Sequence, residues 1–207
     1  MLHRILALVK PLVLSFAAIS LLALAQSEAR ADEVTITGST TGTVTGVPQL
    51  TFAGNNFTGT TALGVGSLSG SNSLGSFFLN TDSLQAVNGT FTLNVTFTVP
   101  TGIAGGQGTT YTATITGSVS PNIDQGGVFV DFTSPTQTFT FNDGTNTGSF
   151  TLTVADVFVQ TGRSAELTAG FTGSQSAIPE PATLLLLGTG LSGIAAGVRR
   201  RRKAANK

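Results

Sequence analysis

Five carboxylates in the middle of the chain are the side chains best suited to acid–base chemistry: Asp124, Asp131, Asp143, Asp156 and Glu166. Two such groups about 5–10 Å apart in a cleft would suit glycoside hydrolysis. However, Asp124 and Asp143 lie in turn-like sequence, and Asp131 alternates outward on an expected strand. Sugar clefts also usually present aromatic platforms, whereas the chain has no Trp and one Tyr. We therefore expect no enzyme, and a carboxylate-dependent hydrolase is the weaker alternative.

The sequence lacks the other groups on which most hydrolytic and metal-dependent enzymes rely. There is no Cys, and the single His is His3. Between Asp32 and Pro181 this excludes nucleophilic catalysis by Ser-His-Asp or Cys-His groups and zinc binding by His or Cys. The same stretch has no Lys for a Schiff base. We expect no cofactor, and a core that stabilises the fold without disulfides.

One short segment has oxygen ligands close enough in sequence for a weak calcium site. Asn142, Asp143 and Asn146 lie within five positions, and carboxylate and amide oxygens are suitable calcium ligands. Yet Asn142-Asp143-Gly144 between two alternating segments is typical of a hairpin turn. The turn is the simpler interpretation, so we expect no metal site.

The charges of the chain are strongly segregated. Nine acidic residues and one basic residue, Arg163, lie between Asp32 and Pro181, which gives this stretch a net charge of −8. So acidic a surface repels phosphate backbones, and nucleic-acid binding is not expected. Arg163 is expected to pair with a neighbouring acid such as Glu166.

The N-terminal segment has the pattern of a secretory signal peptide. Arg4 and Lys10 are followed by an apolar run over 12–25, and Ala29-Arg30-Ala31 supplies an A-x-A cleavage site. An earlier A-x-A, Ala23-Leu24-Ala25, is the competing site. We expect residues 1–31 to be removed, and an uncleaved membrane helix is the alternative.

The C-terminal segment, residues 176–203, has three parts in a fixed order. Pro179-Glu180-Pro181 is followed by an uncharged, mostly apolar stretch over 182–198, and then by a basic cluster: Arg199, Arg200, Arg201, Arg202 and Lys203. As a helix, the apolar stretch would be roughly 25 Å long, slightly short of a bilayer core. The basic cluster should stay on the cytoplasmic side and stop transfer. A transmembrane helix is therefore expected here.

This order of motif, short apolar helix and arginine cluster resembles the PEP-CTERM sorting signal of Gram-negative bacteria. The resemblance implies recognition by an exosortase, which would cut near Pro179–Pro181 after transient anchoring in the inner membrane. It also implies release or transfer to the cell surface or an exopolysaccharide matrix. The same tag occurs on proteins labelled ice-binding. A plain single-span anchor is the alternative interpretation.

The middle of the chain, residues 32–175, is expected to be an antiparallel β-sandwich of Greek-key or jelly-roll type. Apolar and polar residues alternate strictly over 90–99, and the pattern returns over 111–115, 128–132, 139–141 and 150–154. A change of phase near Ala155-Asp156 suggests a bulge. Eight to ten short strands separated by turn-rich links favour a sandwich. A β-solenoid is the runner-up, although no fixed repeat is present.

Threonine dominates the polar faces of the expected strands, as over 90–98 and 110–116. Flat T-x-T arrays are typical of ice-binding surfaces, but Thr is also a good residue for any exposed strand. We therefore expect an exported, surface or matrix protein with a non-catalytic structural or adhesive β-domain. An ice- or carbohydrate-binding surface protein is the alternative.

Overall fold

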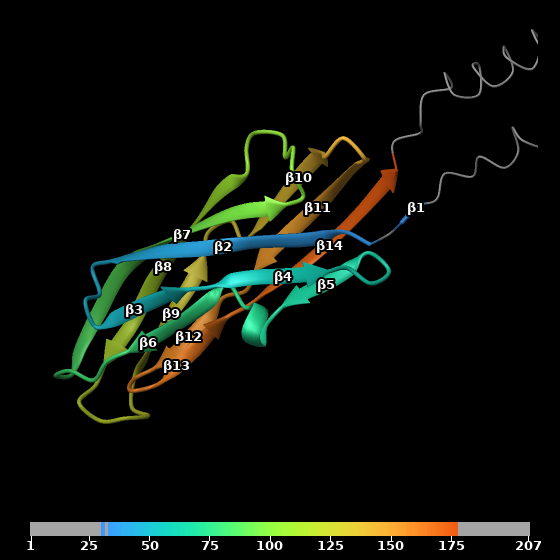
Figure 1. The fold of residues 1–207 in the computed structure, drawn as a ribbon. Coiled ribbons are helices and arrows are strands. Elements are labelled where there is room, and N and C mark those ends of the chain that lie inside the picture. The colour runs from blue at the N-terminus through green and yellow to red at the C-terminus, as the bar shows by residue number, and fades with distance from the viewer. Residues whose placement is uncertain (1–29, 32, 178–207) are drawn as a thin grey trace, which may run out of the picture. The chain divides into compact units, whose positions relative to one another are not determined.

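The computed structural model describes residues 30–31 and 33–177. This part of the chain contains fourteen β-strands, one short 3-10 helix and no α-helix. Every strand pair is antiparallel, so the expectation of an all-β antiparallel fold is confirmed. The strands form three sheets that curl around a common core as a half-barrel (Figure 1).

The large sheet contains six strands and carries half of the chain's threonines. Their order is β12-β9-β8-β7-β2-β4. The bounds are β2 (Thr35–Thr45), β4 (Asn56–Thr60), β7 (Gln85–Val99), β8 (Gly108–Val119), β9 (Gly127–Phe132) and β12 (Val157–Gln160). The long strands β7 and β8 pair over twelve residues, from Gln85–Val119 to Thr96–Gly108.

The second sheet contains five strands and includes the chain's last described strand. Its bounds are β1 (Arg30–Ala31), β5 (Val65–Leu68), β10 (Thr136–Asn142), β11 (Asn146–Val154) and β14 (Ala169–Ala177). The order is β1-β14-β11-β10, and β5 pairs with the same edge of β14. The expected turn at Asn142-Asp143-Gly144 joins β10 to β11, which confirms the predicted hairpin.

The small sheet has three strands, β13 (Ser164–Leu167), β6 (Gly75–Leu79) and β3 (Leu50–Gly54), in that order. Its middle strand β6 alternates strictly, with Gly75, Phe77 and Leu79 buried and Ser76 and Phe78 exposed. The segment between β3 and β6 holds β4, β5 and η1 (Gly70–Asn72), where no alternating pattern was noted. The fourteen strands outnumber the expected eight to ten.

Two groups of phenylalanines join the sheets through the core. Phe52 of β3, Phe77 of β6 and Phe91 of β7 have ring centroids 4.8–4.9 Å apart, which ties the small sheet to the large one. In the second group, Phe97 of β7 lies 5.1 Å from both Phe139 and Phe150, whose rings stack at 4.9 Å. The second group ties the large sheet to the five-stranded one. Aromatic pairs at these separations add to the stability that burial of their area gives.

The strand β7 follows the predicted alternation except at its end. Phe91, Leu93, Val95 and Phe97 are buried as expected, but Val99 is exposed. The register with β2 shifts between Thr37 and Gly38, so that Val99 pairs with Thr37 while Phe97 pairs with Gly38. The irregularity turns Val99 outward, so placing it on the buried face was wrong.

The predicted bulge near Ala155-Asp156 is a change of sheet. The strand β11 ends at Val154 in the five-stranded sheet, and β12 begins at Val157 beside β9 in the large sheet. The phase of the alternation changes because the chain leaves one sheet and enters another whose buried face lies on the opposite side of the core.

The ends of the described domain lie side by side (Figure 1). Arg30 and Ala31, expected to leave with the signal peptide, pair as β1 with Ser176 and Gln175 of β14. Ala29, the sorting motif, the expected span over 182–198 and the basic cluster lie outside the described residues. Within the described part, no helix is long and apolar enough to cross a membrane.

Candidate functional site

The only cation between Asp32 and Pro181 pairs with a different acid from the one expected. Arg163 donates from Nε to Oδ1 of Asp124 over 2.7 Å and from Nη2 to Oδ2 over 2.8 Å. The hydrogen bond and the charge of Arg163 hold the pKa of Asp124 below its ordinary value. The suggested pairing with Glu166 was therefore wrong, and Glu166 instead accepts a hydrogen bond from the N–H of Gly70.

The oxygens considered for calcium are used by the hairpin turn itself. Oδ1 of Asp143 accepts hydrogen bonds from the N–H groups of Thr145 (2.8 Å) and Asn146 (2.7 Å), and these bonds lower the pKa of Asp143. Oδ1 of Asn142 accepts from the N–H of Gly144. Among the described residues, no group of three or more His, Cys, Asp or Glu could hold a metal ion.

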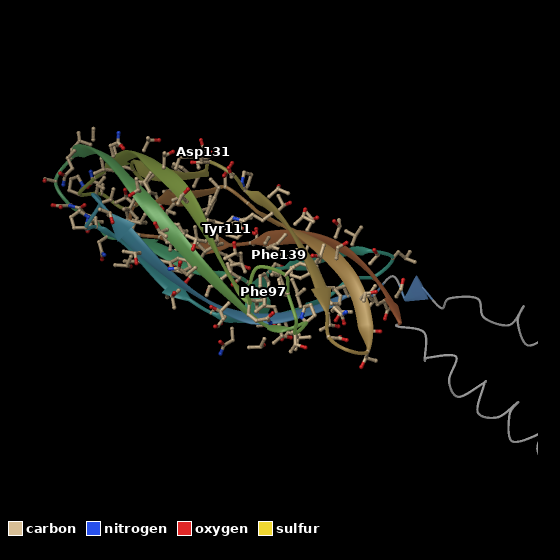
Figure 2. All side chains as sticks on the ribbon, turned by 90° about the horizontal axis from the view of Figure 1, so that it is seen from above. Phe97, Tyr111, Asp131 and Phe139 are labelled. Carbon is tan, nitrogen blue, oxygen red and sulfur yellow. The ribbon has the colours of Figure 1, made fainter. Side chains whose placement is uncertain are left out.

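Asp131 and Asp156 lie at the β9–β12 edge of the large sheet. Asp156 accepts a hydrogen bond from the N–H of Phe132 over 2.9 Å, whereas Asp131 is exposed on the outer face of β9 (Figure 2). Two exposed phenylalanines, Phe129 (44% exposed) and Phe158 (55%), pair across the same two strands. Both differ from most phenylalanines of the described residues, which lie in the core.

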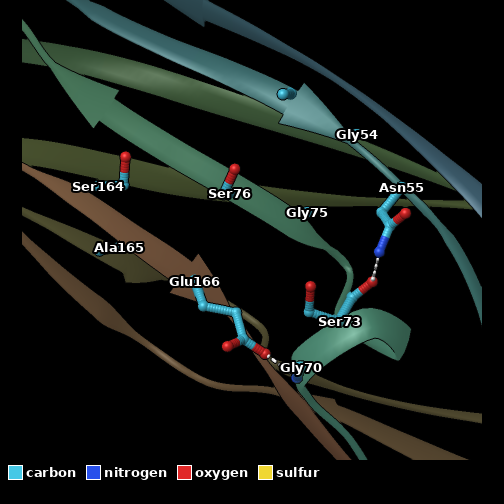
Figure 3. A pocket seen from close by; sticks show the side chains of 10 residues that line it. Gly54, Asn55, Gly70, Ser73, Gly75, Ser76, Ser164, Ala165 and Glu166 are labelled. Atoms are coloured by element: carbon cyan, nitrogen blue, oxygen red, sulfur yellow. Dashed lines mark hydrogen bonds between the residues drawn. The ribbon is translucent and has the colours of Figure 1, made fainter.

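Glu166 is the candidate carboxylate that lies in a cavity. The cavity measures about 530 Å³ and lies on the outer face of the small sheet, beside the turn of η1 (Figure 3). On its floor Ala53, Ser76 and Glu166 are cross-strand neighbours on β3, β6 and β13. The N–H of Gly70 donates to Oε1 of Glu166, which fixes the carboxylate against the η1 turn.

The rest of the cavity lining is small and polar. Ser164 projects from β13 on the same face as Ser76, and Ser73 borders the cavity from the end of η1 (Figure 3). The side-chain amide of Asn55 donates to the carbonyl oxygens of Ser71 (3.1 Å) and Ser73 (3.2 Å), which holds the wall in place. The site therefore combines a positioned carboxylate with several hydroxyl groups.

The outer face of the large sheet carries a regular array of threonines. Thr43, Thr92 and Thr112 are neighbours across β2, β7 and β8, and Thr45, Thr90 and Thr114 form the next row. Elsewhere, cross-strand hydroxyl pairs form at Thr35–Thr60 (2.8 Å) and Thr138–Thr151 (2.9 Å). Such pairs are typical stabilising contacts of antiparallel sheets.

Sequence reasoning singled out Glu166 but missed the cavity around it. Its lining comes from three separated segments, 53–55, 70–76 and 164–166. None of these segments carries a motif, and the pairing of β3, β6 and β13 could not be deduced from alternation. The one available signal was the run of small residues, Gly, Ser and Ala, around β6.

Comparison with known proteins yields one match. Residues 177–202 match the family model described as the PEP-CTERM protein-sorting motif. No curated protein and no solved structure matches the chain. The matched segment begins at the last residue of β14 and covers Pro179, Glu180, Pro181 and the arginines up to Arg202. The chain therefore carries a PEP-CTERM sorting motif, which implies processing by an exosortase and membrane-associated sorting of an exported protein.

Proposed function

We propose that the protein is a non-catalytic structural or adhesive component of the cell surface or extracellular matrix. In this proposal a signal peptide directs export, and the apolar stretch over 182–198 anchors the protein transiently in the inner membrane. Exosortase then cuts near Pro179–Pro181, and the β-domain is released or transferred to the surface. Association with exopolysaccharide is part of the proposal.

The observation that carries the proposal is the position of the sorting motif. The match begins at residue 177, where β14 ends, so the motif directly follows the folded domain. A cut near Pro179–Pro181 would leave all three sheets intact. Among the described residues, removal of residues 1–31 would cost the fold the two residue pairs of β1. Both cuts are thus compatible with a folded product.

The dispersal of the carboxylates supports a non-catalytic domain. Asp124 is paired with Arg163, Asp143 serves its hairpin turn, and Asp156 binds the N–H of Phe132. The cavity on the small sheet is lined by one carboxylate, Glu166, whereas glycoside hydrolysis uses two.

The test is the intact mass of the protein recovered from the surface and medium of its native host. A species that begins near Asp32 and ends between Pro179 and Pro181 is the expected result. A species that still ends at Lys207 and occurs only in the membrane fraction would overturn the sorting proposal and leave a single-span anchored domain.

The threonine array favours a second candidate function, binding of ice or of a crystalline polysaccharide. Rows such as Thr43–Thr92–Thr112 repeat across three strands with regular spacing. Neighbouring strands usually rotate by about 20–25°, so such rows depart from the flat lattice that a crystal face needs. This candidate therefore ranks second. Thermal hysteresis of the recovered protein tests the ice case, which fails if growing ice crystals are unaffected.

A further inference from the structure

We propose that the cavity on the outer face of the small sheet binds a neutral sugar unit of a polysaccharide. This adds a ligand class to the proposed adhesive role, and it rests on that role only in assuming that the glycan comes from the surrounding matrix. It comes from the shape, the hydrogen-bonding groups and the charge of the cavity, together with an exposed aromatic ring on the same strand.

The cavity is an open depression with the volume of a ligand site. Its volume of about 530 Å³ falls within the range of roughly 300–1,000 Å³ typical of small-molecule sites. The depression exists because the outward positions at this point carry small residues, Ala53 and Ser76, while η1 rises beside them as a wall. Gly54 and Gly70 also border it, so a ligand can approach the backbone closely.

The carboxylate of Glu166 is positioned but only partly used. Its Oε1 accepts the N–H of Gly70, and its Oε2 accepts no hydrogen bond within the described part of the chain. Among the residues whose side chains the structure describes, no basic group pairs with Glu166, and Arg163 pairs with Asp124 instead. A fixed carboxylate with an unused oxygen is a strong acceptor for the hydroxyl groups of a sugar.

Three serine hydroxyls complete the polar lining. Ser73 is 5% exposed, yet its hydroxyl has no hydrogen-bond partner among the described residues and points into the cavity (Figure 3). Ser76 and Ser164 present unpaired hydroxyls from adjacent strands. A hydroxyl both donates and accepts, so three of them with one carboxylate match a ligand that does the same on several atoms.

The charge of the site selects against acidic glycans. Glu166 is the one charged side chain that lines the cavity, and the stretch from Asp32 to Pro181 has a net charge of −8. An anionic sugar such as a uronate would be repelled at close range. The polar groups therefore fit a neutral polyol, whose hydroxyls donate to the carboxylate without adding charge.

An aromatic ring lies next to the cavity along β6. Phe78 is 40% exposed and follows Ser76 by two positions, so both side chains lie on the outer face about 7 Å apart. Thr51 and Ser164 flank Phe78 on the neighbouring strands. A sugar ring has an apolar face, and Phe78 provides the apolar surface against which a second unit of the same chain would pack.

The experiment is calorimetric titration of the full chain, purified in a detergent without a sugar head group. The probes are neutral hexasaccharides of glucose, mannose and galactose, with hexagalacturonate as the anionic comparator. Saturable binding of at least one neutral probe is expected, with weaker binding of the anionic one. Glu166→Gln should weaken neutral-probe binding at least about tenfold, because it removes a charge-assisted acceptor.

A second variant and two controls separate a sugar site from general effects on the fold. Ser76→Val fills the floor of the cavity with a side chain suited to strands and should also weaken binding. Ser67→Val makes the same change at an exposed position of β5 outside the cavity lining, and Asp131→Asn neutralises an exposed carboxylate on another sheet. Both controls should bind like the unaltered chain.

Three results would overturn the inference. These are no binding of any neutral probe, equal binding of the anionic probe, and binding that both cavity variants leave unchanged. Each of them leaves the sorting proposal intact, because the masses recovered from the host do not depend on the cavity. Correct processing combined with a failed titration would thus reject the sugar site alone.

Discussion

Arg163 and Asp124 form a two-point ion pair that joins two separate turns of the protein. Both oxygens of the carboxylate accept hydrogen bonds from the guanidinium, at 2.7 and 2.8 Å. Asp124 lies in the loop between β8 and β9, and Arg163 lies in the turn between β12 and β13. The side-chain amide of Gln160 also donates to the carbonyl oxygen of Asp124 over 3.0 Å. The contact connects strands of the large and small sheets at one end of the domain.

Acid should weaken the domain partly through this pair. The pKa values of Asp82, Asp124 and Asp143 are all lowered by hydrogen bonds in the folded state. A carboxyl whose folded pKa is depressed stabilises the protein above its unfolded pKa of about 4, and this contribution disappears as the pH falls through the folded value. The unfolding free energy should therefore decrease as the pH is lowered below about 4.

The variant Asp124→Asn isolates the contribution of one carboxyl. It should lower the urea midpoint slightly at pH 7, because exposed ion pairs stabilise weakly, and the difference from the unaltered chain should vanish near pH 2. Asp131→Asn is the control, since Asp131 is exposed and its side chain has no hydrogen bond within the described residues. A difference for Asp124→Asn that grows as the pH falls would contradict this assignment.

The fold class was predictable from sequence because alternation reports burial directly. In β7 and β8 the period of two separates Phe91 and Tyr111 from Thr92 and Thr112, as the structure has them. The division into three sheets was not predictable. A phase change such as that at Ala155-Asp156 looks the same whether a strand bulges or leaves its sheet, and the outcome depends on which strands pair across the core.

A buried hydroxyl without a partner marks one place where the core is not optimal. The hydroxyl of Tyr111 neither accepts nor donates a hydrogen bond within the described part of the chain, although the residue is buried, with 1% of its surface exposed. Burial raises the pKa of Tyr111 above its ordinary value. Tyr111→Phe removes the unpaired group, whose burial costs about 1–3 kcal/mol. We expect an unfolding free energy raised by about 1 kcal/mol in urea titrations.

The same change should improve resistance to alkali. A folded tyrosine pKa above the unfolded value of about 10 costs stability as the pH rises past 10, and Tyr111→Phe removes that cost. Thr161→Val is the matched variant, because the hydroxyl of Thr161 is also buried without a partner among the described residues. Like Tyr111→Phe, it should raise the unfolding free energy at neutral pH. A loss of more than about 1 kcal/mol for Tyr111→Phe would show that its hydroxyl is bound, for example by an ordered water.

Gly38 should tolerate no larger side chain. A Cβ at this position would overlap the carbonyl oxygen of Thr96 and lie 2.7 Å from the ring of Phe57. Gly38 also lies where the register between β2 and β7 shifts, so the backbone cannot move without disturbing the large sheet. Gly38→Ala should cost about 1–3 kcal/mol of unfolding free energy.

Gly170→Ala is the control for this substitution. Gly170 lies within β14, and nothing is within 4 Å of the position its Cβ would take. The change should be neutral or stabilise the protein by up to about 1 kcal/mol, because it restricts the unfolded chain. Comparable losses from both variants would mean that the strain at Gly38 is not the cause.

Like the division into sheets, the cavity could not be predicted from sequence, but the reason is different. Glu166 is separated by 96 residues from Gly70, the N–H of which fixes it. No local pattern connects the two, and the serines around them look like ordinary exposed strand residues. By contrast, the sorting motif depends on contiguous residues, so Pro179, Glu180 and Pro181 could be identified without any fold.

Substitution of the two motif prolines tests whether they are necessary for processing. Pro179→Ala combined with Pro181→Ala removes both prolines, a residue type that disfavours helical backbone and lacks an N–H donor. In the native host we expect most of this variant to remain in the membrane fraction, with an intact mass that still ends at Lys207. Pro121→Ala, in an exposed loop between β8 and β9, should be processed normally. If the double variant were released at the normal level, recognition would have to depend on Glu180 or on the apolar stretch and its arginines.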